Sequence, residues 1–174
     1  EIIPINKKII INGNGYTIDC SDRNSAFQIS SANVILKNIK IINTNPSDGF
    51  PNAAIHIENK ENITIINCTI INSKQVYFDG VIKVNAPNTK IINCTIINCT
   101  TTQESGAIYV NNQNITITNC TFINNTNNIN GAAIRGGGDN TIIENSTFIN
   151  NNAKTINIGG NNVTIKYCTI EDRT

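Results

Sequence analysis

The stretch Asn62-Ile-Thr-Ile-Ile-Asn-Cys-Thr-Ile-Ile-Asn72 returns 26 residues later as Asn88-Thr-Lys-Ile-Ile-Asn-Cys-Thr-Ile-Ile-Asn98. At the same interval, further copies run from Asn114 to Asn124 and from Asn140 to Asn150. Three fainter copies begin at Asn14, Asn33 and Asn162. Self-similarity at a fixed period of this length is the sequence signature of a repeat architecture, in which each copy forms one structural unit that stacks on the next.

Within each copy, small or apolar residues alternate with Thr, and a period of two predicts a β-strand. The column at the seventh position of the copies reads Cys20, Ile39, Cys68, Cys94, Cys120, Ser146 and Cys168. The column two positions later reads Asp22, Ile41, Ile70, Ile96, Phe122, Phe148 and Ile170. We expect these two columns to point into a core. The Thr residues between them should then point outwards: Thr69, Thr95, Thr121, Thr147 and Thr169.

A second segment with apolar outer residues and a different middle residue follows in six copies. Its members are Phe27–Ile29, Ile55–Ile57, Ile82–Val84, Ile108–Val110, Ile134–Gly136 and Ile156–Ile158. The first part of each copy supplies another short strand, for example Ile115–Ile117. Three short strands per copy predict an all-β fold, a parallel β-helix of about seven coils. Its crossovers should be right-handed, as such connections nearly always are, and residues 1–174 should form a single β-helix domain.

Each copy ends in an Asn or Asp, namely Asn24, Asn43, Asn72, Asn98, Asn124, Asn150 and Asp172. Stacked Asn side chains hydrogen-bond to one another in stacked sheets, and Asn tolerates the left-handed backbone that a corner requires. We expect this Asn ladder to point inwards, like the Cys/Ile column. Asn98 and Asn124 lie in Asn-x-Thr sequons, and inward side chains would leave both without a glycan.

Nearly all variation in length falls between the corner Asn and the second strand, so one edge of the solenoid should carry loops of differing size. Insertions on one face often mark the binding face of a repeat protein. Beside these loops runs an outward column of Gln28, His56, Lys83, Tyr109, Arg135 and Asn157. Column and loops together supply the predicted ligand-binding residues: Phe50, His56, Tyr77, Phe78, Asp79, Lys83, Tyr109 and Arg135.

Aromatic rings beside polar side chains suit a glycan or a protein ligand. We expect Tyr109 to be exposed. For Phe50 and Phe78, an exposed contact and a loop anchor folded back onto the coil edge remain equal alternatives. His56 is the one histidine of the chain, and as an isolated outward residue it is expected at the surface.

The six cysteines include no Cys-x-x-Cys pair, so a zinc site is not predicted. Cysteines at the same position of adjacent coils lie about 4.8 Å apart, in a side-by-side geometry that is poor for a disulfide. We therefore expect free, buried thiols that behave as small apolar side chains. Asp48, Asp79 and Asp139 share no repeating spacing, which gives no basis for a calcium site. Neither a metal nor a cofactor is predicted.

The chain has a net charge of +1, and 14% of its residues are charged. A nucleic-acid partner is not expected because such proteins carry a basic stripe. No run of 18 apolar residues occurs in the sequence, so no membrane span is predicted. Catalysis on polysaccharides would need clustered carboxylates or a suitable base on an outward face. The column beside the loops contains no acid, and we expect a non-enzyme, with a polysaccharide lyase or hydrolase as the alternative.

A further outward surface consists of Thr/Ile pairs in four successive copies, Thr69/Ile71, Thr95/Ile97, Thr121/Ile123 and Thr147/Ile149. Exposed Ile over four coils often marks self-association or another protein contact. Ice binding through the regular Thr ladder and an ordinary solvated face are the other two possibilities for this surface.

Two pairs of segments carry a family resemblance. Gly106-Ala-Ile108 with Cys120-Thr-Phe-Ile-Asn124, and Gly131-Ala-Ala-Ile134 with Ser146-Thr-Phe-Ile-Asn150, resemble the paired GG-A-I and F-x-x-N motifs of polymorphic outer-membrane proteins. The doubled glycine is replaced by Ser105-Gly106 and Asn130-Gly131. The opening Ile9-Ile-Ile-Asn-Gly-Asn-Gly-Tyr-Thr-Ile-Asp19 resembles the first coil of adhesin-like surface proteins of methanogenic archaea.

The resemblance covers nearly the whole chain, and it implies a long secreted or anchored protein that contacts other cells or surfaces. Pectate-lyase-like enzymes share the same coils. From the resemblance and the column beside the loops, we expect an extracellular, adhesin-like module that binds a glycan or protein of a host or partner cell. The segment is expected to be part of a larger surface protein, because Arg173 and Thr174 stop inside a coil and solenoids need capped ends.

Overall fold

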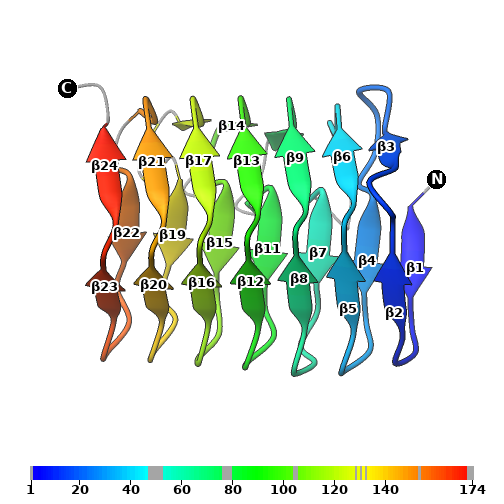
Figure 1. The fold of residues 1–174 in the computed structure, drawn as a ribbon, viewed down its shortest axis with the longest axis horizontal. Helices are drawn as coiled ribbons and strands as arrows, with labels where there is room; N and C mark the ends of the chain where they lie inside the picture. The colour runs from blue at the N-terminus through cyan, green and yellow to red at the C-terminus, as the bar shows by residue number, and fades with distance from the viewer. Residues whose placement is uncertain are drawn as a thin grey trace.

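The computed structural model describes residues 2–46, 53–75, 80–103, 106–127, 129, 131, 133–152 and 154–171. Within these residues all the regular elements are strands, and they stack as successive coils of a rod (Figure 1). Three parallel sheets of seven strands run along the rod, each taking one strand from every coil. The predicted parallel β-helix, with about seven coils and three strands per coil, is confirmed.

The three long sheets are named here by the order in which the chain enters them. Sheet A contains β1 (Ile3–Ile5), β4 (Phe27–Ile29), β7 (Ile55–Ile57), β11 (Ile82–Val84), β15 (Ile108–Val110), β19 (Ile134–Gly136) and β22 (Ile156–Ile158). Sheet B contains β2 (Ile10–Asn12), β5 (Ile35–Lys37), β8 (Thr64–Ile66), β12 (Lys90–Ile92), β16 (Thr116–Thr118), β20 (Ile142–Glu144) and β23 (Thr164–Lys166). Sheet C contains β3 (Thr17–Asp19), β6 (Lys40–Ile42), β9 (Thr69–Ile71), β13 (Thr95–Ile97), β17 (Thr121–Ile123), β21 (Thr147–Ile149) and β24 (Thr169–Glu171).

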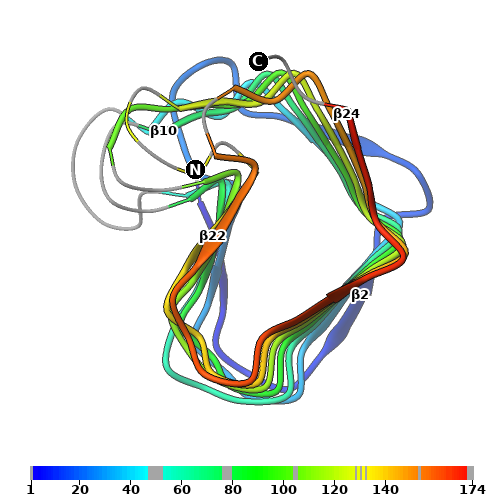
Figure 2. The ribbon, with the colours of Figure 1, turned by 90° about the vertical axis from the view of Figure 1, so that its left-hand side faces the viewer.

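A short fourth sheet, sheet D, was not predicted. It joins β10 (Lys74–Gln75), β14 (Thr100–Thr101) and β18 (Thr126–Asn127), which directly follow the corner after sheet C. Viewed along the rod, the coils lie almost on top of one another, with sheets A, B and C as the long sides (Figure 2). Equivalent residues therefore form straight columns along the whole molecule.

The core consists of the inward columns of the three long sheets. In sheet C the middle residue of each strand points in: Ile41, Ile70, Ile96, Phe122 and Phe148 are at most 1% exposed. The Phe122 and Phe148 rings stack with centroids 4.9 Å apart and planes 3° from parallel. Burying each large apolar side chain contributes about 1.5–3 kcal/mol to folding. The outward position of Thr69, Thr95, Thr121 and Thr147, all only partly exposed, is confirmed.

Each typical coil has left-handed backbone at three corners, whereas the sequence predicted it at one corner only. In the third coil these residues are Asn62, Asn67 and Asn72, with φ of 58°, 51° and 54°. Asn tolerates this conformation better than other residues with a Cβ. A single left-handed residue turns the chain sharply between two strands, which explains why Asn recurs every five residues in the repeat.

The inward direction predicted for the last of these Asn columns is wrong. Asn98 and Asn124 are exposed, and the Asn124 Nδ2 donates to the Asn98 Oδ1 at 3.3 Å on the outer surface. The left-handed residue interrupts the alternation of the strand, so that Ile97 and Asn98 both face outwards and Cys99 faces in. Both sequons were expected to stay unmodified because their side chains would be buried. Since both side chains are exposed, that reason no longer applies.

A buried polar column lies one residue beyond this corner, made of Thr44, Ser73, Cys99, Asn125 and Asn151. The inward Asn ladder of this molecule is here. The Asn125 Oδ1 accepts from the Cys99 N–H at 3.1 Å, and the Asn151 Oδ1 accepts from the Asn125 N–H at 3.0 Å. The Asn125 Nδ2 donates to the Ile96 carbonyl at 3.0 Å. These bonds satisfy amide groups that have no access to water.

The first coil is out of register with its predicted alignment. Thr17 pairs with Lys40 and Asn12 with Lys37, so the corner between sheets B and C holds two more residues in the first coil than in the second. Cys20 and Asp22 therefore do not belong to the two core columns in which they were placed. A Cβ added to Gly13 would lie 2.7 Å from the Asn38 carbonyl oxygen, so this wider corner depends on a glycine.

Substituting Asn125 with Ala tests the buried polar column. Asn125→Ala should lower the free energy of unfolding by about 1–3 kcal/mol, because the Cys99 N–H loses its acceptor in a buried site. The matched control is Asn111→Ala, which removes an exposed amide that donates to the Asn85 Oδ1 at 3.2 Å. It should cost about 0.5 kcal/mol or less. Urea unfolding of both variants gives the comparison, and equal losses would contradict the assignment.

Candidate functional site

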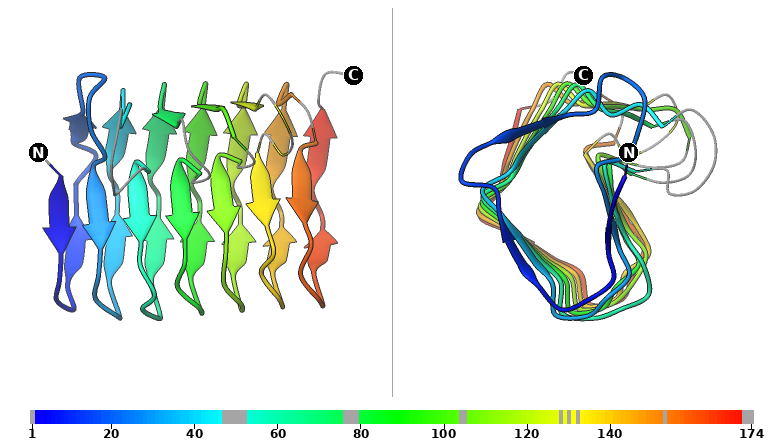
Figure 3. Two further views of the ribbon diagram at one scale, coloured as in Figure 1. Left: turned by 180° about the vertical axis from the view of Figure 1, so that it is seen from behind. Right: turned by 90° about the vertical axis from the view of Figure 1, so that its right-hand side faces the viewer.

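The predicted column on the outer face of sheet A is present in the predicted order. The strand registers align Gln28, His56, Lys83, Tyr109, Arg135 and Asn157 in successive coils. In β4, β11 and β15 the outer two residues are buried and the middle one is partly exposed. Figure 3 (left) shows this sheet in front. Lys83, Tyr109 and Arg135 are partly exposed, about one strand spacing of 4.8 Å from one to the next.

His56 departs from its prediction as a surface residue, because it is completely buried. All three residues of β7 are buried, which distinguishes it from the other strands of sheet A. Strand alternation fixes which side of a sheet a residue faces, but not what covers that side. His56 therefore belongs to the outer column by register, while its imidazole is enclosed.

Four of the predicted ligand-binding residues, Phe50, Tyr77, Phe78 and Asp79, lie outside the described residues. Their predicted role as contacts on the loop edge stays a prediction. The part of the site that the structure describes is the column of sheet A and the turns that follow its strands.

A polar hollow of about 410 Å³ adjoins this column where sheet A leads into sheet B. Its accessible lining consists of Glu58, Asn59, Lys60 and Asn85, and the completely buried His56 lies beneath them. The Gln28 Nε2 donates to the Glu58 Oε1 at 2.7 Å, so the carboxylate is held by the column residue of the preceding coil. A concave surface with a few convergent polar groups is the usual form of a small-ligand site, and carboxylate, amide and ammonium groups can all hydrogen-bond to hydroxyls.

On the far side of the hollow, Asn85 is held in the same way. Its Oδ1 accepts from the Asn111 Nδ2 at 3.2 Å, and its carbonyl accepts from the Asn112 Nδ2 at 2.7 Å. These residues were not predicted as ligand contacts, because the loops before sheet A vary in length whereas the turns after it are nearly constant. The polar run Glu58-Asn-Lys-Glu61, directly after β7, was the available signal.

Two other hollows, of about 440 and 480 Å³, lie beside the first coils. The first is lined by Asn14, Gly15, Asn38, Ile39, Lys40, Asn67 and Thr69. The second is lined by Lys8, Ile9, Ile10, Asn33, Ile35, Asn62 and Thr64. Neither combines acidic and basic side chains. A smaller hollow of about 390 Å³ does, but it shares Asn59 and Lys60 with the hollow beside sheet A and lies next to it, so we take the hollow beside sheet A as the candidate site.

Comparison with known proteins agrees with the parallel β-helix described above. The family described as right-handed β-helix region matches residues 5–139. The chain belongs to the right-handed β-helix family. No curated protein matches it. Because one fold supports several unrelated functions, membership establishes the coils and leaves the choice between a binding protein and an enzyme to the site.

Over the described ranges, no group of three His, Cys, Asp or Glu side chains is placed to hold a metal ion. The Asp139 Oδ1 accepts from the Asn161 N–H at 2.7 Å and from its Nδ2 at 3.2 Å, so this carboxylate caps a turn. No helix long and apolar enough to cross a membrane is found among the residues that the structure describes.

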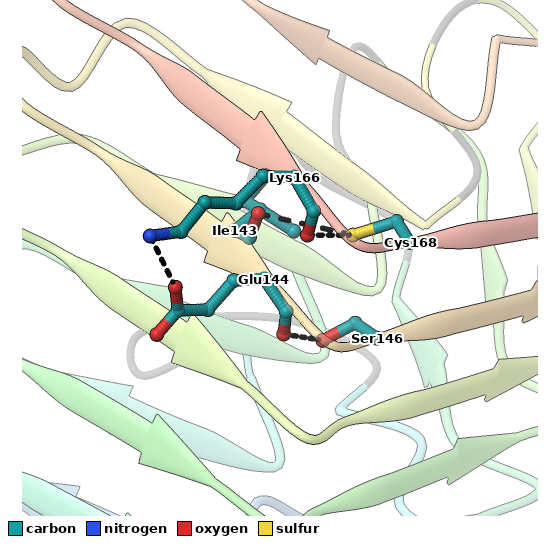
Figure 4. Close-up of polar contacts among 5 residues, drawn as sticks. All are labelled: Ile143, Glu144, Ser146, Lys166 and Cys168. Carbon is teal, nitrogen blue, oxygen red and sulfur yellow. Dashed lines mark hydrogen bonds and ion pairs between the residues drawn. The ribbon is translucent and has the colours of Figure 1, made fainter.

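The cysteine column of the β-helix contains Cys68, Cys94, Cys120 and Cys168, with Ser146 between the last two. All six cysteines of the chain are free thiols. The Cys94 thiol donates to the Ile92 carbonyl at 3.3 Å, and the equivalent Ser146 hydroxyl donates to the Glu144 carbonyl at 2.9 Å. Figure 4 shows Ser146 and Cys168 in this shared position. A small side chain that donates a hydrogen bond is what the column has in common.

Cys99 lies in the neighbouring buried polar column. Its Sγ is 3.3 Å from the Ile97 carbonyl oxygen, and the side chain is 1% exposed. Burial raises the pKa of the Cys99 thiol to about 12, because the thiolate would lose its hydration. Cys99 is therefore a structural residue that stays protonated in the folded protein at neutral pH.

Thiol alkylation tests this assignment. At mildly alkaline pH, Cys99 should react with iodoacetamide only after unfolding, whereas Cys168, which is partly exposed, should react in the native protein. The folded pKa lies above the ordinary value of 9.0, so the contribution of this thiol to stability is complete below pH 9.0 and lost as the pH rises towards about 12. Mass spectrometry locates the label, and rapid native labelling of Cys99 would contradict its burial.

Proposed function

We propose that this β-helix is an adhesin-like binding module without catalytic activity, exported to the cell surface, and that it binds a glycan of a partner cell. The observation that carries the proposal is the polar hollow beside the straight outer column of sheet A. The hollow offers polar groups for sugar hydroxyls, and the column offers an aromatic ring at its centre. This combination is typical of sites that recognise carbohydrate.

The polar groups of the hollow are oriented before any ligand binds. Gln28 fixes the Glu58 carboxylate at 2.7 Å, and Asn111 fixes the Asn85 amide at 3.2 Å. Side chains that are already ordered lose less conformational entropy on binding. Lys60 adds an ammonium donor on the same lining. A hydroxyl-rich ligand would therefore find acceptors and donors in fixed positions.

Tyr109 stands between Lys83 and Arg135 in the register of sheet A. An aromatic ring presents a flat apolar face with a hydroxyl at its tip, which suits the apolar face of a sugar ring. Positions in the column repeat about every 4.8 Å along the rod. A regular column of this kind favours an extended polymer that lies along the rod, and for this reason we propose a glycan in preference to a globular protein.

Binding without turnover is proposed because the lining of the hollow includes a single carboxylate, Glu58. Hydrolysis of a glycosidic bond ordinarily uses two carboxyl groups that flank the bond. The Glu58 Oε1 is engaged by the Gln28 amide. This arrangement holds a ligand more readily than it transfers a proton to a leaving group.

The test is a glycan array followed by calorimetry with the best glycan and the intact segment. Tyr109→Ala should weaken binding by about 1 kcal/mol or more if the ring is a hot spot. Asn85→Ala should weaken it because an oriented amide in the hollow is lost. The matched control is Thr116→Ala, which changes a partly exposed outward residue on sheet B and should leave binding unchanged.

Three results would contradict the proposal. Release of reducing sugar from a bound polysaccharide would make the protein an enzyme. If Thr116→Ala weakens glycan binding and Tyr109→Ala does not, the binding site lies on sheet B and not on sheet A. A protein captured from partner cells that still binds after complete deglycosylation would replace the glycan as the ligand.

A further inference from the structure

The outer face of sheet C carries no charged residue over four successive coils. Its two outward columns are Thr69, Thr95, Thr121 and Thr147, and Ile71, Ile97, Ile123 and Ile149. Neighbouring coils pair these residues in register, and all eight are partly exposed. The outer face of sheet B differs, since it includes Lys37, Lys90, Glu144 and Lys166.

Exposed Asn columns border the Thr/Ile columns on both sides. Asn67, Asn93, Asn119 and Asn145 precede the strands, and Asn72, Asn98, Asn124 and Asn150 follow them. The result is a flat, uncharged surface four coils long, referred to here as the Thr/Ile face. Covering it would bury partly exposed Ile side chains. Each Å² of apolar surface removed from water would contribute about 25 cal/mol to association. No ionised group would have to be desolvated in the centre of the contact.

Charged residues appear at the two ends of this face, and their signs are opposite. Lys40 lies in β6, one coil before the Thr/Ile face, and Glu171 lies in β24, one coil after it. Both side chains are exposed. Lys40 also borders the hollow of about 440 Å³ that includes Asn38 and Thr69, so there is room for a partner group beside it.

We propose that a second copy of this chain packs on the Thr/Ile face, with the two rods antiparallel. A two-fold axis along the strand direction would then place β9 against the partner's β21 and β13 against the partner's β17. With the axis in this direction Thr would face Thr and Ile would face Ile, and every contact would occur twice, as in any two-fold interface. Two sheets packed in this way lie about 10 Å apart.

The charges select the antiparallel arrangement. It brings Lys40 diagonally opposite Glu171 of the partner subunit at both ends of the contact. A parallel arrangement would bring the two Lys40 side chains together, and like charges at an interface disfavour association. The contact lies away from the outer column of sheet A, so it leaves the proposed glycan site open on both copies and does not depend on that proposal.

Sedimentation equilibrium over a range of concentrations tests the contact. The protein should form dimers, and the double variant Ile97→Lys/Ile123→Lys should be monomeric. The matched control is Ile66→Lys/Ile92→Lys, which places the same charges on partly exposed Ile residues at the same strand positions of sheet B. It should still form dimers. Circular dichroism confirms that each variant retains its β-structure.

The orientation is tested by charge exchange and by cross-linking. Lys40→Glu should weaken the dimer at least several-fold, and adding Glu171→Lys should restore it. In an equimolar mixture of Thr95→Cys and Thr121→Cys proteins, both made with Cys20→Ser and Cys168→Ser to remove the partly exposed native thiols, a short bifunctional maleimide should link one variant to the other. A monomeric wild-type protein, equal loss of dimer in the sheet B control, or linkage confined to identical variants would overturn the proposal.

Discussion

The structure depends on the left-handed Asn residues that turn the chain between strands. In the fourth coil these are Asn88, Asn93 and Asn98, with φ of 56°, 56° and 53°. Asn93 and Asn98 directly follow β12 and β13 and end them, and Asn88 turns the chain two residues before β12, which keeps the strands at three residues and lets every coil repeat the same outline. Parallel strands in register then follow, since equal coils superimpose. The ladder bond from the Asn93 Nδ2 to the Asn67 Oδ1, at 3.0 Å, joins successive corners on the outer surface.

Because equal coils stack in register, the interior and each outer face have their own set of residues along the whole rod. The interior takes apolar columns and small donors, and each coil is stabilised chiefly by contact with its two neighbours. The same columns are about half exposed in the last coil, where Ile165 and Ile170 are 48% and 53% exposed, because burial needs a coil on each side. Sheet A carries the aromatic and basic column, and sheet C carries the uncharged Thr/Ile face. Two different partners can therefore be accommodated on separate sides of one rod.

Most of the fold followed from the repeat, because period-two alternation and fixed copy length determine strands and stacking. The second strands, such as Ile55–Ile57, were predicted to the residue. Whether a side chain points inwards or outwards could not be predicted for residues beyond a corner. A left-handed residue such as Asn98 shifts the inward-outward alternation of side chains by one residue. The order of the column through Lys83, Tyr109 and Arg135 was predicted. The burial of His56 and the hollow at Glu58 were not, since both depend on how neighbouring turns pack in three dimensions.

The central claim, that left-handed corners determine this fold, is tested most directly at Asn93. Asn93→Gly and Asn93→Ala both remove the ladder bond, but only Ala must adopt the left-handed backbone with a Cβ and no compensating side-chain hydrogen bond. The free energy of unfolding, measured with urea, should be lower for Asn93→Ala than for Asn93→Gly by about 1–2 kcal/mol. Equal stability of the two variants, or a more stable Ala variant, would contradict the claim.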